Sequence, residues 1–243
     1  MISTNPLDII GQFFLNLKRR FKIFYQNSNF YEKKISKTFQ DSFEYKPSPH
    51  LLSSIIKYNS KKYKIDDFAV EAIWKNNLNS KDYKKLNNFF WFFSLDLKSS
   101  KKTTQTVIKN WISNNIKYQS KSWEFDLTAK RIISWLSNHQ LTYEDSDQDY
   151  RSAFNHMIQK QTNHLLNEIK NPKELNNKMI GCAAIILTGL AYKNEKEYLH
   201  SGLNLLKNII KSSIDNNGFP KSRNIRQLKF YLKYFIIIRE WFK

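Results

Sequence analysis

Residues 174–192, ELNNKMIGCAAIILTGLAY, are the stretch of this sequence that decides its fold. Its apolar residues return at steps of three and four, which places one stripe along the side of a helix. At 1.5 Å per residue this helix is about 27 Å long. The residues of the stripe are Leu175, Met179, Ala183, Ile186 and Leu190.

Polar side chains mark the entrance of this helix and of a later one. Backbone N–H groups in a first helical turn are unpaired, and the helix dipole favours anions there. Residues 214–228, IDNNGFPKSRNIRQL, form a turn that opens the last helix. We expect the two entrances, separated by one helix, to face a common cleft; the simpler interpretation is that the asparagines cap helices and Gly218 turns the chain. The candidate binding residues are Asn176, Asn177, Arg223, Asn224 and Gln227.

Composition bounds the class of protein. With 243 residues, the chain makes one large domain or two small ones. Five glycines and five prolines favour long helices over a β architecture rich in turns. Apolar residues at 41% and aromatic residues at 15% are enough for a sizeable core and exclude a disordered chain.

The net charge of +19 narrows the class of partner. Only seven of the 40 basic residues are arginine, and the abundant lysine matches what an A/T-rich coding sequence produces. A strongly basic domain nevertheless attracts polyanions. Nucleic acid, acidic lipid and acidic polysaccharide therefore all stay open as partners.

The residues predict no metal site and no cofactor. Cys182 is the single cysteine, so no internal disulfide forms, and its apolar neighbours suggest a buried thiol that behaves as a small hydrophobe. The histidines are too scattered for metal-ligand spacing. They are His50, His139, His156, His164 and His200.

The first residues predict an amphipathic helix. Its basic cluster, Lys18 to Arg20, follows the apolar stretch, which does not fit a signal peptide. We expect the helix to pack on the body of the protein; the alternative is a membrane surface, with the basic face toward anionic lipid. No apolar run is long enough to span a membrane. The stripe consists of Leu7, Ile10, Phe14, Leu17, Phe21 and Phe24.

Residues 1–66 read as this helix followed by an irregular lead-in, with a loop or short strands at 41–66. Residues 67–243 read as an all-α domain, and its helical periods continue from residue 103 to the end. Helices of similar length with short polar links are typical of bundles, α-solenoids and α/α toroids. Predicted buried residues are Trp111, Trp135, Phe154, Leu165, Ile186 and Leu206.

Several segments together resemble the N-terminal region of bacterial heparinase II/III-type polysaccharide lyases. They are NFFWFFSLDLKS at 88–99, the long segment 107–139, QTNHLLNEI at 161–169, NNKMIGCAAIILTGLAY at 176–192 and NGFPKSRNIRQLKFYLKYFIIIREWF at 217–242. The resemblance covers roughly residues 70–243 and implies an incomplete α/α toroid. It also implies a β-sandwich domain after the toroid. Because the sequence stops inside an apolar helix at 240–243, we expect a fragment or one half of a split protein.

The resemblance implies β-elimination on a glycan that contains uronic acid. Such chemistry needs donors that neutralise the carboxylate and a tyrosine or histidine that moves the proton. Asn176 matches the asparagine expected at the carboxylate, and Arg223 with Asn224 match the second entrance. The chain departs from the family where proton-transfer residues are usual: Asn177 stands at a common histidine position, Phe219 lies near a second one, and Gln227 lies near a tyrosine position. The catalytic base therefore stays unassigned, and the candidates are Tyr192, Tyr231, His164 and His139.

Three functions follow as expectations. The first is the helical domain of a lyase-like protein that acts on or binds acidic polysaccharide and is incomplete alone. The second is a catalytically inactive glycan-binding or interaction scaffold on the same fold. The third, a basic nucleic-acid binder, lacks any helix-turn-helix, RNA-binding or zinc pattern. The compartment stays open: the family implies the bacterial periplasm, and the lack of a signal peptide favours the cytoplasm.

Overall fold

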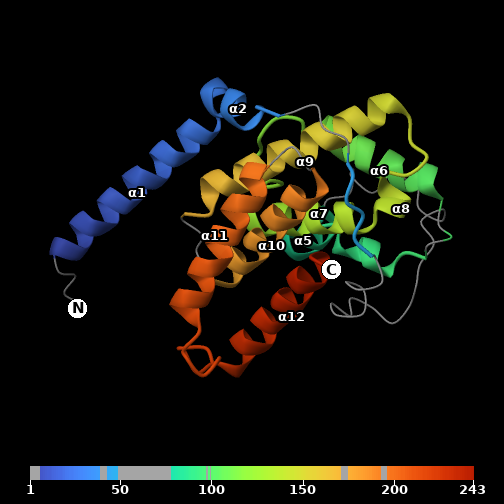
Figure 1. Ribbon diagram of the computed structural model, residues 1–243. Helices are drawn as coiled ribbons and strands as arrows, with labels where there is room; N and C mark the ends of the chain where they lie inside the picture. Colours follow the sequence, from blue (N-terminus) through green and yellow to red (C-terminus); the bar gives the residue numbers. More distant parts are fainter. Residues whose placement is uncertain are drawn as a thin grey trace.

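The computed structural model describes residues 6–38, 43–48, 78–96, 98, 100–170, 175–192 and 196–243. These ranges contain helices and no β-strand; isolated bridge residues occur at Leu95 and between Ile214 and Pro220. The expected all-α class is therefore confirmed (Figure 1). The helices are α1 (Pro6–Gln26), α2 (Asn29–Ile35), α5 (Ser80–Asn87), the 3-10 helix η2 (Phe90–Ser94), α6 (Lys101–Asn114), α7 (Phe125–Ser137), α8 (His139–Thr142), α9 (Gln148–Glu168), α10 (Leu175–Ala191), α11 (Lys196–Ser213) and α12 (Ile225–Trp241).

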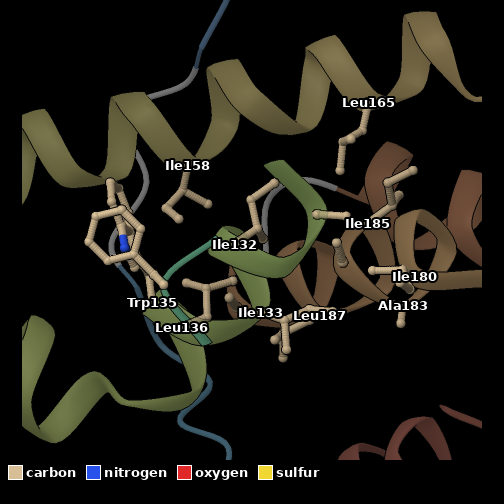
Figure 2. Close-up of a cluster of buried hydrophobic side chains, with 14 of the residues drawn as sticks. Ile132, Ile133, Trp135, Leu136, Ile158, Leu165, Ile180, Ala183, Ile185 and Leu187 are labelled. Carbon is tan, nitrogen blue, oxygen red and sulfur yellow. The ribbon is translucent and has the colours of Figure 1, made fainter. Parts of the chain in front are cut away.

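Helices α7 and α10 form the centre of the body. Nearly every residue of α7 from Leu127 to Ser137 is buried, and α10 is buried from Met179 to Leu187. A helix that is apolar on all sides belongs inside a protein, so α10 carries more than the single stripe expected from its spacing. Figure 2 shows side chains of α7, α9 and α10 meeting in this core, among them Ile132, Leu165 and Ile185.

Helices α10 and α11 run antiparallel and approach closely at two glycines. A Cβ on Gly189 would lie 2.4 Å from the backbone nitrogen of Leu199, and one on Gly202 would lie 2.6 Å from a side-chain carbon of Ile186. Position 189 thus meets the start of α11, and position 186 meets a point further along it. The end of α11 therefore lies toward the start of α10, and the link 214–224 then leads into α12.

The N-terminal helices behave differently from each other. Helix α2 is docked on the body, with Tyr31 and Ile35 buried. Helix α1 extends away from the body (Figure 1), and its apolar side chains from Ile10 onward are in solvent, with Phe24 78% exposed and Phe21 65% exposed. The expectation that α1 packs on the body is therefore wrong: only its last turn, around Lys22 and Gln26, reaches another element through a hydrogen bond or ion pair that the structure records.

The segment expected to be irregular is described only in part. Residues 43–48 are extended and belong to no helix or strand. Phe43 is buried against Tyr143, and the Glu44 N–H donates to the carbonyl of Ala191 over 2.9 Å. The rest of the predicted lead-in, and the expected domain boundary at residue 66, lie outside the described residues.

The core prediction holds for most of its members. Trp111, Trp135, Phe154, Leu165 and Ile186 are all fully buried. Leu206 is only partly buried, although it packs against the core. The all-helical body beyond residue 100 is likewise found in the described ranges, whereas an incomplete ring of helical hairpins stays a prediction.

Aspartates mark the starts of two helices. Asp147 caps α9, because its side chain accepts from the backbone N–H of Tyr150. Asp126 lies in the first turn of α7, which begins at Phe125. There its carboxylate pairs with Lys130 at 3.0 Å, one turn later.

Candidate functional site

The link before α12 is organised by Asp215. Its Oδ1 accepts from the backbone N–H groups of Asn217 at 3.0 Å and Phe219 at 2.9 Å, and its Oδ2 lies 2.6 Å from Nη1 of Arg223. The Phe219 N–H contributes most to holding the pKa of this carboxyl below its usual value. Gly218, with φ at 82°, turns the chain as the simpler interpretation predicted.

The three candidate residues at the start of α12 therefore have local partners. Arg223 pairs with Asp215, the carboxylate of its own link. Asn224 caps α12, since its side-chain oxygen accepts from the N–H of Arg226 at 2.9 Å. Gln227 accepts from the hydroxyl of Ser222 and donates to the Tyr231 oxygen at 3.2 Å. The start of α12 is therefore a capped helix, and its arginine is held in an ion pair within the preceding link.

The other predicted pair begins α10. Asn176 lies in the first turn, and its side chain is outside the description; Asn177 is half-buried. The antiparallel packing of α10 and α11 turns the starts of α10 and α12 toward the same end of the hairpin. The structure records no hydrogen bond or ion pair between Asn177 and Arg223, so a shared cleft stays a prediction.

A pocket of about 200 Å³ lies where α10 begins, and Asn177 is one of its lining residues. Its walls come from the end of α1, the segment before α7, the start of α7, the end of α9 and the start of α10. The pocket mixes aromatic rings, amides and carboxylates. Its lining residues are Lys22, Gln26, Tyr118, Ser120, Trp123, Glu124, Phe125, Asp126, His164, Glu168 and Asn177.

One wall of the pocket is a small polar network. The Glu168 carboxylate accepts from Lys22 and, at 2.9 Å, from the amide nitrogen of Gln26. The Gln26 oxygen in turn accepts from the hydroxyl of Tyr118 at 3.0 Å. Burial, with a smaller contribution from Glu168, raises the pKa of Tyr118 to about 12. This phenol is therefore neutral and a donor at physiological pH.

Three carboxylates line the pocket, and each one has a lysine. Glu168 pairs with Lys22, Glu124 with Lys84 at 2.8 Å, and Asp126 with Lys130 at 3.0 Å. The paired charges leave the pocket close to neutral. Such a lining offers hydrogen bonds to hydroxyl groups without the excess positive charge that a single anion would need.

His164 lines the pocket and has a fixed tautomer. Its Nε2 donates to the carbonyl oxygen of Trp123 at 2.9 Å, because a carbonyl only accepts. The Nδ1 of the neutral ring is then an acceptor, and it accepts a hydrogen bond of 2.7 Å from the hydroxyl of Tyr31. Complete burial lowers the pKa of His164 to about 3, and burial also raises the pKa of Tyr31. Both ring nitrogens are engaged, so His164 is not poised to accept a further proton.

The other candidate bases are engaged as well. His139 is buried against Glu144, with 3.1 Å between Nδ1 and the carboxylate, and burial lowers its pKa despite that carboxylate. The Tyr192 hydroxyl donates to Asn155 at 2.9 Å. The Tyr231 oxygen accepts from Gln227. None of these three residues lines the pocket.

The described residues hold no cluster of metal ligands and no helix that is long and apolar enough to cross a membrane. Cys182 is buried, and burial raises the pKa of its thiol to about 12. It therefore packs as an apolar side chain, as the sequence suggested, with its sulfur 3.4 Å from the Gly202 carbonyl.

Sequence reasoning named Asn177 and His164 but did not bring them together. Phe125 connects the two parts of the site, because it lines the pocket and its ring lies beside Gly181 of α10. Glycine in a helix is unfavourable unless packing requires it, and this was the available signal of a close contact. Nothing in the sequence indicated that Lys22 and Gln26, at the end of α1, belong to the pocket. Their partner Glu168 is 146 residues from Lys22 along the chain.

Comparison of the chain with family models, with curated proteins and with solved structures finds no match. The resemblance to polysaccharide lyases therefore rests on the quoted residues alone.

Proposed function

We propose that this chain is a glycan-binding helical domain, that its ligands are acidic polysaccharides, and that the chain alone does not catalyse β-elimination. The observation that carries the proposal is the pocket, whose lining combines the rings of Tyr118 and Phe125 with the amide groups of Gln26 and Asn177. A sugar ring has an apolar face and a rim of hydroxyls, so it is suited to a site that combines rings with amides. The resemblance to lyases of acidic glycans supports the ligand class, and an incomplete α/α toroid is the proposed arrangement.

The pocket and the surface around it differ in charge, so we expect them to bind different groups of the glycan. The paired carboxylates of Glu168, Glu124 and Asp126 favour hydroxyl groups inside the pocket over a bare carboxylate. The net charge of +19 attracts an anionic polymer to the surface around it. We therefore expect a polyanion to bind through its length, with one sugar unit in the pocket.

Turnover is not expected from the residues described here. A β-elimination needs a group that removes the proton next to the uronate carboxylate. His164 is the candidate that lines the pocket, and both of its ring nitrogens already hold partners. Asn177 stands where the family commonly has histidine, and an amide does not exchange a proton near neutral pH.

The experiment is a binding titration with heparin, alginate and chondroitin oligosaccharides, and with an uncharged dextran of similar length. We expect the acidic glycans to bind and N177A to weaken binding by about 0.5–1.5 kcal/mol, the range for one neutral hydrogen bond. N208A, at an exposed asparagine of α11 outside the pocket lining, is the matched control and should bind like the unaltered protein.

Two further readings decide between the functions. Elimination leaves a conjugated double bond that absorbs in the near ultraviolet, so rising absorbance during incubation would show a lyase and contradict the absence of turnover. Salt-dependent binding to DNA with no binding to any glycan would favour the nucleic-acid interpretation. Equal affinity of N177A and the unaltered protein for the acidic glycans would show that the pocket does not bind them.

A further inference from the structure

Helix α1 presents an exposed apolar face that the body leaves uncovered. It extends away from the other helices (Figure 1), and the structure ties it to them through Lys22 and Gln26 in its last turns. Phe13 is 63% exposed and Phe14 62% exposed, and their rings contact each other edge to face. Side chains of this size rarely stand together in water without a partner surface.

Six of the exposed apolar side chains gather on one side of the helix, whereas Leu15 and Ile23 lie on the opposite side. At about 100° per residue, these six form an apolar set within an arc of about 100°. Lys18 lies just beyond one edge of this arc and Arg20 just beyond the other, with Arg19 on the opposite side. Long basic side chains in such positions place their alkyl stems along an apolar surface while their charges reach the surrounding polar layer. The apolar set is Ile10, Phe13, Phe14, Leu17, Phe21 and Phe24.

We propose that α1 lies flat in the surface of an anionic lipid membrane and anchors the domain there. A strongly amphipathic helix with phenylalanine and leucine on one face and basic residues on the other binds such interfaces. Besides Lys22, which pairs with Glu168, helix α1 has three cations, Lys18, Arg19 and Arg20, against the single anion Asp8. Anionic lipid adds attraction for each cation near the surface.

Charge also decides between lipid and a second copy of this chain. Pairing two α1 helices would bring together two proteins that each carry a net charge of +19. It would also set the basic edges at Lys18 and Arg20 beside those of another copy. An anionic bilayer covers the same apolar face and neutralises the same cations.

The test is sedimentation of the full chain with two kinds of vesicle, phosphatidylcholine alone and equal parts of phosphatidylcholine and phosphatidylglycerol. We expect binding to the mixed vesicles and little to the neutral ones. The paired substitution F14S/F21S on the apolar arc should reduce binding at least tenfold. Q12S/N16S, on the polar side of the same helix, is the matched control and should bind like the unaltered protein.

Each other outcome overturns the proposal. Unchanged binding of F14S/F21S would show that the basic body, rather than the apolar arc, holds the vesicles. Equal binding to both kinds of vesicle would show that anionic lipid is not required. A dimer that F14S/F21S abolishes would make a second copy the occupant, and a lower unfolding temperature of F14S/F21S would show that the face packs on the chain itself.

Discussion

The guanidinium carbon of Arg131 lies 3.9 Å from the ring centre of Trp111, in the interior of the body. Arg131 is fully buried, and its acceptors are all neutral oxygens: the carbonyls of Asn87 and Ser122, at 2.8 and 3.1 Å, and the side chains of Gln161 and Thr128. Burial lowers the pKa of this group well below its usual value. A buried cation is costly unless it is fully hydrogen-bonded, and here a cation–π contact and these oxygens hold it.

Replacing Arg131 is expected to destabilise the protein strongly. R131L leaves the Asn87 and Ser122 carbonyls and the Gln161 amide oxygen without their donor. At about 1–3 kcal/mol for each unsatisfied group, we expect the free energy of unfolding to fall by at least about 3 kcal/mol in urea titrations. R239L, at an exposed arginine of α12, is the control and should stay within about 0.5 kcal/mol. Equal unfolding midpoints for the two variants would contradict this account.

The close approach of α10 and α11 gives a second prediction. G189A adds a Cβ 2.4 Å from the Leu199 nitrogen, and backbone cannot move aside as a side-chain tip can. We expect a loss of about 1–3 kcal/mol, the usual range for overpacking. G11A makes the same change in α1 where nothing lies within 4 Å, so there alanine should be neutral or stabilise the helix. Thermal unfolding of both variants is the measurement; a stable G189A would refute the helix contact.

The buried His164 predicts a pH dependence. Its pKa is about 3 in the folded protein, against about 6.5 for an unperturbed histidine in an unfolded chain. Between these values the unfolded chain binds a proton that the folded protein does not, so stability falls as pH falls from about 6.5 toward 3. The slope approaches about 1.4 kcal/mol per pH unit for this single site.

The comparison that isolates His164 is H164Q. An amide can accept from Tyr31 and donate to the Trp123 carbonyl, but it does not titrate. The free energy of unfolding is measured by denaturant titration at several pH values between about 4 and 7, a range set by the two pKa values. Its dependence on pH should be less steep for H164Q than for the unaltered protein, by the amount that one proton contributes. Parallel slopes for the two proteins would show that His164 is charged when folded.

The ion pair at the second entrance allows a test of the predicted shared site. D215N keeps Oδ1, which accepts from Asn217 and Phe219, and removes the charge that holds Arg223. If Arg223 is a glycan ligand, D215N should bind acidic glycans more tightly, and R223A should bind them more weakly by about 1.5–3 kcal/mol. Unaltered affinity in both variants would confine Arg223 to closing the link before α12.

Periodicity predicted the helical body well because burial follows a local pattern. Trp111, Trp135 and Phe154 stand on helical stripes and are buried as expected. The position of α1 was not predictable in this way. Its stripe, including Phe14 and Phe21, shows that one face avoids water, but the sequence does not say whether protein or another phase covers that face.

The candidate site was less accessible to sequence reasoning. Asn177 and Arg223 were grouped because both stand at helix entrances, yet Arg223 pairs with Asp215 in its own link. Local partners compete with distant ones, and spacing along the chain does not rank them. The pocket around His164 joins elements from α1 to α10, which requires contacts that a single sequence does not reveal.

The Tyr31–His164 hydrogen bond has a consequence for the order of assembly. It joins residues 133 positions apart, and the Lys160–Glu32 ion pair beside it spans 128 positions. During synthesis the first 35 residues leave the ribosome long before α9 exists, so α2 waits without its binding surface. The beginning of the chain is thus among the last parts to be placed, and closing this long loop is expected to be a late step in folding.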